Sequence, residues 1–396
     1  MTSPALYDLS PLLRLMAAGV LLAVGPMAWV WFRNRGASPR VMKTGRLHAL
    51  TLITLFLTFD LVLFGAFTRL TDSGLGCPDW PGCYGNASPL GAHNDIASAQ
   101  AAMPTGPVTR GKAWIEMIHR YLATGVGVLI LVTAVASWLA PRHLSRRLIS
   151  PWWATATLVW VCIQGAFGAL TVTMKLFPAI VTLHLLGGLV LLALLCVQVV
   201  RHSQLQSGAT AVQPPVVVDG STRTLVWLAF AALVVQIALG GWVSTNYAVL
   251  ACNEFPRCQG SWWPVMNFEQ GFEIWRRLGF TQQGEHIGFA ALTAIHYVHR
   301  MMAAVVLLLV GLLAWRLNGT PGLRVQSRWL AGLLGLQLAT GLSNVVLDWP
   351  LLAALLHTGG AAALVLVLTW VVCASQSAVE PVATSVGLPP VSGLNA

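Results

Sequence analysis

The chain has 396 residues, of which 56% are hydrophobic and only 9% are charged. Soluble domains carry about 25% charged residues, so this composition excludes an ordinary soluble globule and indicates a polytopic membrane protein. The net charge of +10 does not indicate a nucleic-acid partner, because the basic residues are spread over several loops instead of forming one patch.

Apolar stretches long enough to cross a bilayer, which takes about 20 residues, occur nine times along the chain. Basic residues such as Arg33, Lys43, Arg201 and Arg316 follow every second stretch. By the positive-inside rule these loops are cytoplasmic, so the N-terminus is predicted to lie outside and the C-terminus inside a cell inner membrane. The predicted spans lie near 11–32, 47–68, 114–139, 152–173, 178–200, 224–244, 287–315, 328–347 and 351–373.

A distinctive loop follows the second span. It begins with the motif Thr68-Arg69-Leu70-Thr71-Asp72-Ser73-Gly74-Leu75 and continues to Cys77 and Cys83. The sixth span leads in a similar way to Cys252 and Cys258. Both cysteine pairs have an acid, an aromatic residue and a proline at matching offsets between them, which indicates an internal repeat.

The repeat unit is predicted to be four spans, 47–200 and 224–373. Gly65 lies twelve residues before the first cysteine pair, and Gly240 lies twelve before the second. An even number of spans gives both copies the same orientation, related by a pseudo-two-fold axis along the membrane normal. The predicted fold class is therefore an all-α polytopic membrane protein with two tandem four-helix bundles.

Three segments fall outside the two bundles. Residues 1–46 are predicted to form an extra N-terminal transmembrane helix and a cytoplasmic loop. Residues 201–223 are predicted to be a cytoplasmic linker, and residues 374–396 a disordered cytoplasmic tail.

The loop cysteines allow two interpretations. Their predicted position in an oxidising compartment favours disulfides between Cys77 and Cys83 and between Cys252 and Cys258. A close pair can also bind a metal, but His93 is the one histidine near either pair. Disulfides are the favoured interpretation, and whether they are structural or redox-active stays open.

Two related polar motifs begin the third and seventh spans. The first is Trp114-Ile-Glu116-Met-Ile-His119-Arg120, and the second is Ile295-His296-Tyr-Val-His299-Arg300. On a helix, Glu116 and His119 are three residues apart and share one face. The second motif has His296 where the first has Glu116, which predicts two related sites of which only one has a carboxylate.

The last span of each repeat adds one more histidine, His184 or His357. Two histidines on facing helices of a four-helix bundle are typical of axial haem ligation, whereas zinc would need more ligands. Arg120 and Arg300, each next to a candidate ligand, either pair with haem propionates or extend to the membrane interface.

Other residues within the spans also have two interpretations. Gly125, Gly168 and Gly187 either leave room for a flat macrocycle or are contact points between packed helices. Asp60 is expected to pair with a neighbouring helix, with proton movement as the alternative.

Together the loop motif, the two cysteine pairs and the two histidine–arginine motifs resemble haem A synthase, the membrane enzyme family that oxidises haem O to haem A. The resemblance covers roughly residues 47–373. It implies that the N-terminal bundle binds haem O, with His119 and His184 as axial ligands to its iron. It also implies that Arg120 contributes to this substrate site and that Glu116 is the catalytic carboxylate.

In the C-terminal bundle, the resemblance implies haem b as an electron carrier between His299 and His357, with Arg300 beside it. The implied reaction oxidises the C8 methyl group stepwise to a geminal diol, which loses water to give the formyl group. Haem O synthase, an electron donor and the lipid membrane are the implied partners, and a homo-oligomer stays open.

Two other functions compete with this one. A bis-His di-haem electron-transfer protein of the quinol-linked cytochrome b type explains four histidines, but not why Glu116 has a histidine counterpart. A transporter built on repeats explains the fold and Asp60, but it leaves the paired histidines without a role.

Overall fold

The computed structural model describes residues 10–33, 39–140, 150–206 and 216–377. Within these ranges nine helices are long and apolar enough to cross a membrane, as the hydrophobic pattern predicts. They are α1 (Ser10–Arg33), α2 (Pro39–Leu70), α4 (Arg110–Leu139), α6 (Pro151–Thr173), α7 (Pro178–Gln206), α8 (Gly220–Thr245), α10 (Phe289–Asn318), α11 (Arg324–Val346) and α12 (Leu351–Ala374).

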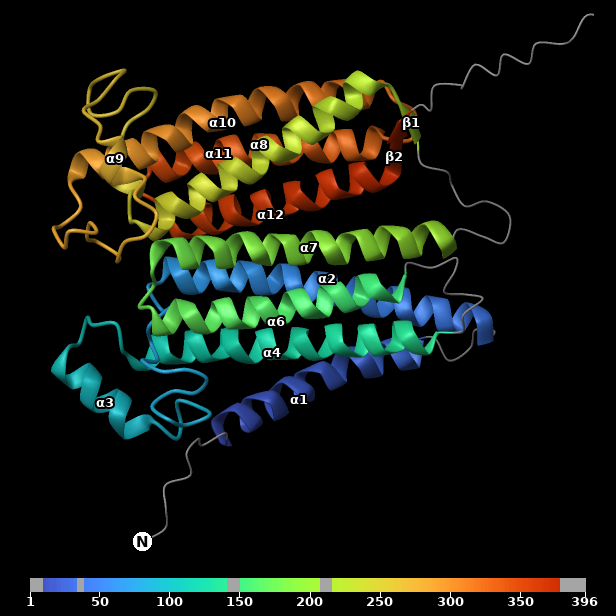
Figure 1. Cartoon of the computed structure of the whole chain (residues 1–396), viewed down its shortest axis with the longest axis horizontal. Helices are drawn as coiled ribbons and strands as arrows, with labels where there is room; N and C mark the ends of the chain where they lie inside the picture. Colours follow the sequence, from blue (N-terminus) through green and yellow to red (C-terminus); the bar gives the residue numbers. More distant parts are fainter. Residues whose placement is uncertain (1–9, 34–38, 141–149, 207–215, 378–396) are drawn as a thin grey trace, which may run out of the picture.

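Shorter elements lie at the two ends of the long helices (Figure 1). At one end are the outer loops, with α3 (His93–Ala102), a 3-10 turn at Val249–Ala251 and α9 (Phe268–Gly271). At the other end β1 (Val216–Val218) pairs in parallel with β2 (Ser375–Ser377).

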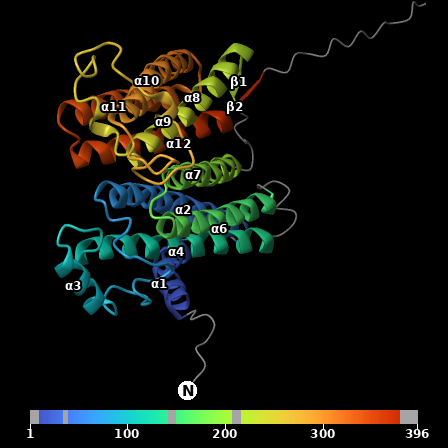
Figure 2. The same ribbon diagram turned by 60° about the vertical axis from the view of Figure 1, so that its left-hand side comes forward.

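The helices pack in two groups of four. Helix α2 packs against α4 and α7, and α6 closes the first group by packing against the same two helices. In the second group α10 packs against α8 and α11, and α12 packs against α11 and α8. Helix α7 of the first group packs against α12 of the second, and α1 packs on the outside of α4 (Figure 2). The grouping follows the sequence repeat, and the pseudo-two-fold axis stays a prediction.

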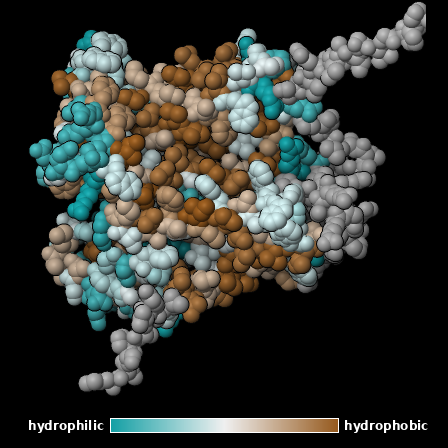
Figure 3. All heavy atoms as spheres, viewed as in Figure 1, coloured by the Kyte–Doolittle hydropathy of each residue, from teal (hydrophilic) through white to brown (hydrophobic). Residues whose placement is uncertain are grey.

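The surface over the middle of the long helices is apolar (Figure 3). Large hydrophobic side chains such as Leu21, Leu131 and Leu308 are exposed along these helices. Such a surface is stable in lipid and not in water. The chain is therefore a multi-pass membrane protein.

Among the residues that it describes, the structure does not show the predicted pairing of Asp60 with a neighbouring helix. It lies on the exposed side of α2, and no hydrogen bond or ion pair reaches it from any residue that the structure describes. The expected pairing with a neighbouring helix is thus not found within the described chain.

The predicted boundaries of the linker and tail need correction. Helix α7 continues to Gln206 and α8 begins at Gly220, so both enter the predicted linker 201–223. Residues 374–377, predicted as part of a disordered tail, complete α12 and form β2, whose main chain is fixed by pairing with β1. Residues 378–396, the rest of the predicted tail, lie outside the described ranges.

Candidate functional site

The four predicted haem ligands fall on two pairs of helices. His119 lies on α4 and His184 on α7, two helices that both pack against α2 and α6 in the first group. His299 lies on α10 and His357 on α12, which both pack against α8 and α11 in the second group. The structure therefore places each predicted pair within one group of four helices.

Each of these histidines packs against a glycine on an adjacent helix. A Cβ atom at that glycine would stand between 3.0 and 3.4 Å from Cε1 of the imidazole, closer than side chains normally approach. The glycine makes room for the ring to lie against the neighbouring backbone. The pairs are Gly65–His119, Gly168–His184, Gly240–His299 and Gly341–His357.

This arrangement was only partly visible in the sequence. The cysteine spacing singled out Gly65 and Gly240 as repeat markers but gave them no role. In contrast, Gly125 faces α1, and the space at Gly187 is filled by Gln164, whose Nε2 would lie 1.9 Å from an added Cβ. These two glycines therefore support helix packing and not an opening for a macrocycle.

The unpaired imidazole nitrogens do not by themselves identify the ligands. The buried Nδ1 atoms of His119, His184 and His299 have no hydrogen-bond partner among the described residues, but neither do those of His202 and His296, which are not candidate ligands. No group of three or more His, Cys, Asp or Glu side chains that could hold a metal ion occurs in the described ranges. Two imidazoles per site therefore fit a haem iron better than zinc.

Glu116 is 4% exposed and holds the first disulfide loop. Its Oε2 accepts a hydrogen bond of 2.8 Å from the N–H of Cys77, and its Oε1 forms an ion pair with Arg120. The same guanidinium donates to the carbonyls of Pro81 and Gly82. The carboxylate is thus fixed by the loop that covers its helix, a contact that the sequence did not predict.

His296 occupies the equivalent position in the second half. Its Nε2 accepts a hydrogen bond of 3.3 Å from Arg300, which also donates to the carbonyls of Cys252 and Glu254. Both arginines therefore bind the carbonyls of the disulfide loops. Arg120 is only 8% exposed, so it does not extend to the interface, and a contact with a haem propionate stays a prediction.

The structure confirms both disulfides, Cys77–Cys83 and Cys252–Cys258. In each loop the predicted acid accepts hydrogen bonds from the backbone after the second cysteine. Asp79 accepts from the N–H groups of Tyr84 and Gly85, and Glu254 accepts from that of Gly260. The acids therefore close the loops, which explains why they recur at the same offset.

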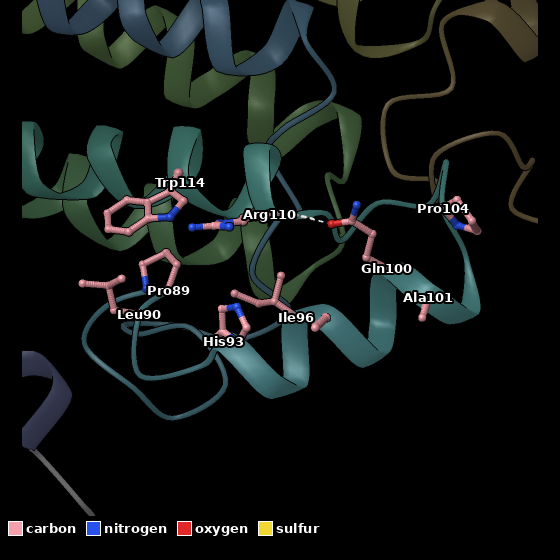
Figure 4. A pocket seen from close by; sticks show the side chains of 10 residues that line it. Pro89, Leu90, His93, Ile96, Gln100, Ala101, Pro104, Arg110 and Trp114 are labelled. Carbon is pink, nitrogen blue, oxygen red and sulfur yellow. Dashed lines mark hydrogen bonds between the residues drawn. The ribbon is translucent and has the colours of Figure 1, made fainter.

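His93 is exposed, and the cysteines of both pairs bond to each other and not to a metal that it could share. It begins α3 and lines a pocket between α3 and the first turns of α4, together with Gln100, Arg110 and Trp114 (Figure 4). The backbone N–H of Arg110 donates to Oε1 of Gln100 at 2.9 Å. None of the four candidate haem ligands lines this pocket, so it is separate from the candidate site.

The motif after α2 joins the two halves. Arg69 donates to the hydroxyl of Tyr247 at 2.9 Å and to the carbonyl of Ser244 at 2.6 Å, and it pairs with Asp72 at 3.2 Å. The Tyr247 hydroxyl donates to Asp72 at 2.7 Å. These contacts lie one helical turn beyond the glycines that hold the histidines of α4 and α10. They therefore fix the two candidate sites relative to each other.

Comparison with known proteins agrees with this geometry. Residues 48–369 match the family described as cytochrome oxidase assembly protein. The chain is 40% identical to the haem A synthase of Shewanella oneidensis, over 80% of this chain and 92% of that protein. It is 26% identical to the haem A synthase of Halalkalibacterium halodurans, over 74% and 85%, and 29% identical to that of a Chelativorans species, over 76% and 82%. The chain therefore belongs to the haem A synthase family of cytochrome oxidase assembly proteins.

Proposed function

We propose that this protein oxidises the C8 methyl group of haem O to a formyl group. Haem O would bind between His119 and His184, and haem b would bind as electron carrier between His299 and His357. The observation that carries the proposal is the repeated histidine–glycine geometry of the two halves, combined with a carboxylate in only one of them.

A difference behind the ligands supports haem b as the resident group of the C-terminal half. Nδ1 of His357 lies 3.0 Å from the hydroxyl of Thr340, and such a contact fixes the orientation and tautomer of a ligating imidazole. The equivalent residue behind His184 is Phe167, which has no hydrogen-bonding group. A firmly oriented ligand suits a permanent cofactor, whereas a less constrained one suits a substrate that must leave.

The haem iron would supply the redox chemistry when it is bound. The residues of the chain position the substrate and handle protons. Glu116 lies one helical turn before His119 and is held by the N–H of Cys77 and by Arg120. A carboxylate fixed in this way can accept or return a proton beside the reacting carbon.

Further parts of the proposal concern the surroundings of the enzyme. Haem O synthase would supply the substrate, and a separate electron donor would exchange electrons with haem b. The disulfide loops would face the outside of a cell inner membrane, with the N-terminus on that side and the C-terminus in the cytoplasm. The distribution of basic residues supports this orientation.

The direct test is haem extraction and mass analysis of the purified protein after expression with a haem O source. We expect haem A as product and haem b as retained cofactor. An electron-transfer protein would bind haem b but form no haem A. A transporter would contain no haem.

The matched glycines offer a test of which half binds which haem. An Ala side chain at Gly65 or Gly240 would stand 3.1 or 3.0 Å from the facing imidazole. Overpacking of this kind costs about 1–3 kcal/mol. We expect Gly65→Ala to weaken haem O binding by about 5- to 150-fold with haem b unchanged, and Gly240→Ala to do the reverse, as measured by spectral titration. Loss of the same haem from both variants would contradict the assignment.

A further inference from the structure

The core of the N-terminal bundle contains a tract of buried polar side chains. It runs from the end opposite the disulfide loops toward the His119–His184 site. Its members come from all four helices of the bundle, and each is at most 9% exposed. They are Thr51, Thr54 and Thr58 on α2, Thr133 and Ser137 on α4, Thr157 on α6, and Gln198 and His202 on α7. We call this set the polar tract.

The C-terminal bundle has apolar residues at seven of the eight matching positions. The histidine–glycine pairs fix the correspondence between α2 and α8, α4 and α10, α6 and α11, and α7 and α12. Seven of the eight tract positions correspond in this way to members of one buried hydrophobic cluster, and His202 corresponds to Ser375. The seven counterparts are Val226, Ala229, Leu233, Leu313, Leu317, Leu330 and Val371.

The helices do not need these polar side chains in order to be stable. The tract hydroxyls donate to carbonyls of their own helices four residues back, as Thr54 does to Leu50 at 2.7 Å, and each oxygen keeps the capacity to accept another hydrogen bond. Apolar residues fill the same positions in the other half. Polar side chains inside a membrane protein are costly and usually functional.

At the end of the tract opposite the disulfide loops, two members have side chains other than hydroxyls, the imidazole of His202 and the amide of Gln198. His202 is 4% exposed, and its buried Nδ1 has no hydrogen-bond partner among the described residues. Farther in, Nε2 of Gln198 donates to the hydroxyl of Thr157 at 2.9 Å, which joins α7 to the neighbouring helix α6.

The other end of the tract approaches the candidate substrate site. Thr58 lies seven residues, or about 10 Å along the helix, from the glycine that holds His119. Gln164 lies one turn from the glycine that holds His184, and its buried Oε1 has no partner among the described residues. Polar groups therefore occur at intervals of one or two helical turns from His202 to the two ligands.

We propose that the polar tract, with Gln164, is a proton route between the aqueous side opposite the disulfide loops and the substrate site. This inference rests on the proposed function. Oxidation of a methyl group to a formyl group releases protons and electrons when water supplies the oxygen atom, and takes up protons and donor electrons when O₂ supplies it. Protons must therefore enter or leave the substrate site in either case, whereas an electron-carrying haem b needs no such route. That difference accounts for polar side chains at the tract positions of one half and apolar side chains at seven of the eight matching positions of the other. Protons would pass along the hydroxyls, Gln198 and water between them, with His202 as the entry group.

The test compares substitutions inside the tract with one outside it. Gln198→Leu and Thr157→Val remove the hydrogen bond between α7 and α6, and Thr54→Ala introduces the residue found at the matching position of α8. The control is Thr369→Val, because Thr369 is a buried threonine of the other half with the same kind of bond to its own helix. Haem b content, the rate of haem A formation and its solvent isotope effect are measured for each variant.

We expect the tract variants to keep haem b, to form haem A at least about tenfold more slowly and to show a larger solvent isotope effect, because proton transfer becomes limiting. Thr369→Val should match the unmodified protein. Unchanged rates in the tract variants, or slower rates with an unchanged isotope effect, would overturn the proposal.

A second measurement needs no turnover. Deuterium exchange at the imidazole C2 position, located by mass spectrometry, should be faster at His202 than at His119 and His184, because water reaches the far end of the tract. Protection of His202 equal to theirs would count against the route. Absence of haem A from the unmodified protein would instead contradict the proposed function, and exchange at His202 would still test the route by itself.

Discussion

Replacement of Glu116 by Gln should lower haem A formation on the order of 100-fold or more while haem b stays bound. This is the usual scale for the loss of a positioned acid or base. Gln has nearly the same size and can still accept the hydrogen bond from the N–H of Cys77, but it cannot take up a proton. Haem O or the singly hydroxylated intermediate should accumulate, which extraction and mass analysis would show.

The ion pair between Glu116 and Arg120 gives a competing explanation for such a loss. Removing one partner of a buried pair leaves the other charge uncompensated and can cost about 3–5 kcal/mol. Arg120→Gln separates the two effects, because it breaks the same pair and keeps the carboxylate. If the carboxylate handles protons, Arg120→Gln retains substantially more activity than Glu116→Gln at equal protein and haem b content.

Equal losses in the two variants would return Glu116 to a structural role. It would then only hold the disulfide loop on α4, as His296 and Arg300 hold the loop of the other half. Near-normal haem A formation by Glu116→Gln would exclude the carboxylate from the chemistry.

Most of the fold could be predicted because a membrane imposes simple rules on a sequence. Each span must be apolar over about 20 residues, so the nine helices were visible as composition. The cysteine spacing and the repeated acids showed the internal duplication, which the four histidine–glycine pairs confirm at the level of contacts. The last residues of α12 and the β1–β2 pair were missed because a three-residue strand has too little pattern to be recognised.

The contacts of the site were harder to predict because they join residues far apart in the chain. Arg120 had two proposed partners, a propionate or the interface, yet it binds Glu116 and loop carbonyls nearly 40 residues away. Arg69 similarly reaches Tyr247 in the other half. Sequence spacing identifies neighbours on one helix, such as Glu116 and His119, but not the loop that folds back over them.

The polar tract illustrates a different limit. A threonine in an apolar span is common, so Thr54 or Thr157 alone indicates nothing. The pattern indicates a function only when the structure shows that these side chains are buried and that apolar residues fill the matching positions of the other half. The comparison also depends on helix-by-helix alignment, which only the histidine–glycine contacts make secure.

The second large effect is expected from the ligands themselves. His299→Ala and His357→Ala should each abolish stable haem b binding, because each would remove one of the two imidazoles that are proposed to hold the iron. His119→Ala and His184→Ala should keep haem b and instead lose haem O binding and haem A formation. The measurement is the haem content of each purified variant by absorption spectrum and extraction.

The two halves serve as controls for each other. The four histidines have the same partial burial and the same glycine contact, so a general loss of folding should affect the four variants alike. A selective loss of haem b from the α10 and α12 variants requires that the halves bind different haems. Equal loss of haem b from all four histidine variants would contradict the assignment of carrier and substrate sites.

The hydrogen bond between Thr340 and Nδ1 of His357 predicts a smaller effect. Thr340→Val should weaken haem b binding by roughly 10- to 100-fold, the usual effect of losing a group that orients a metal ligand.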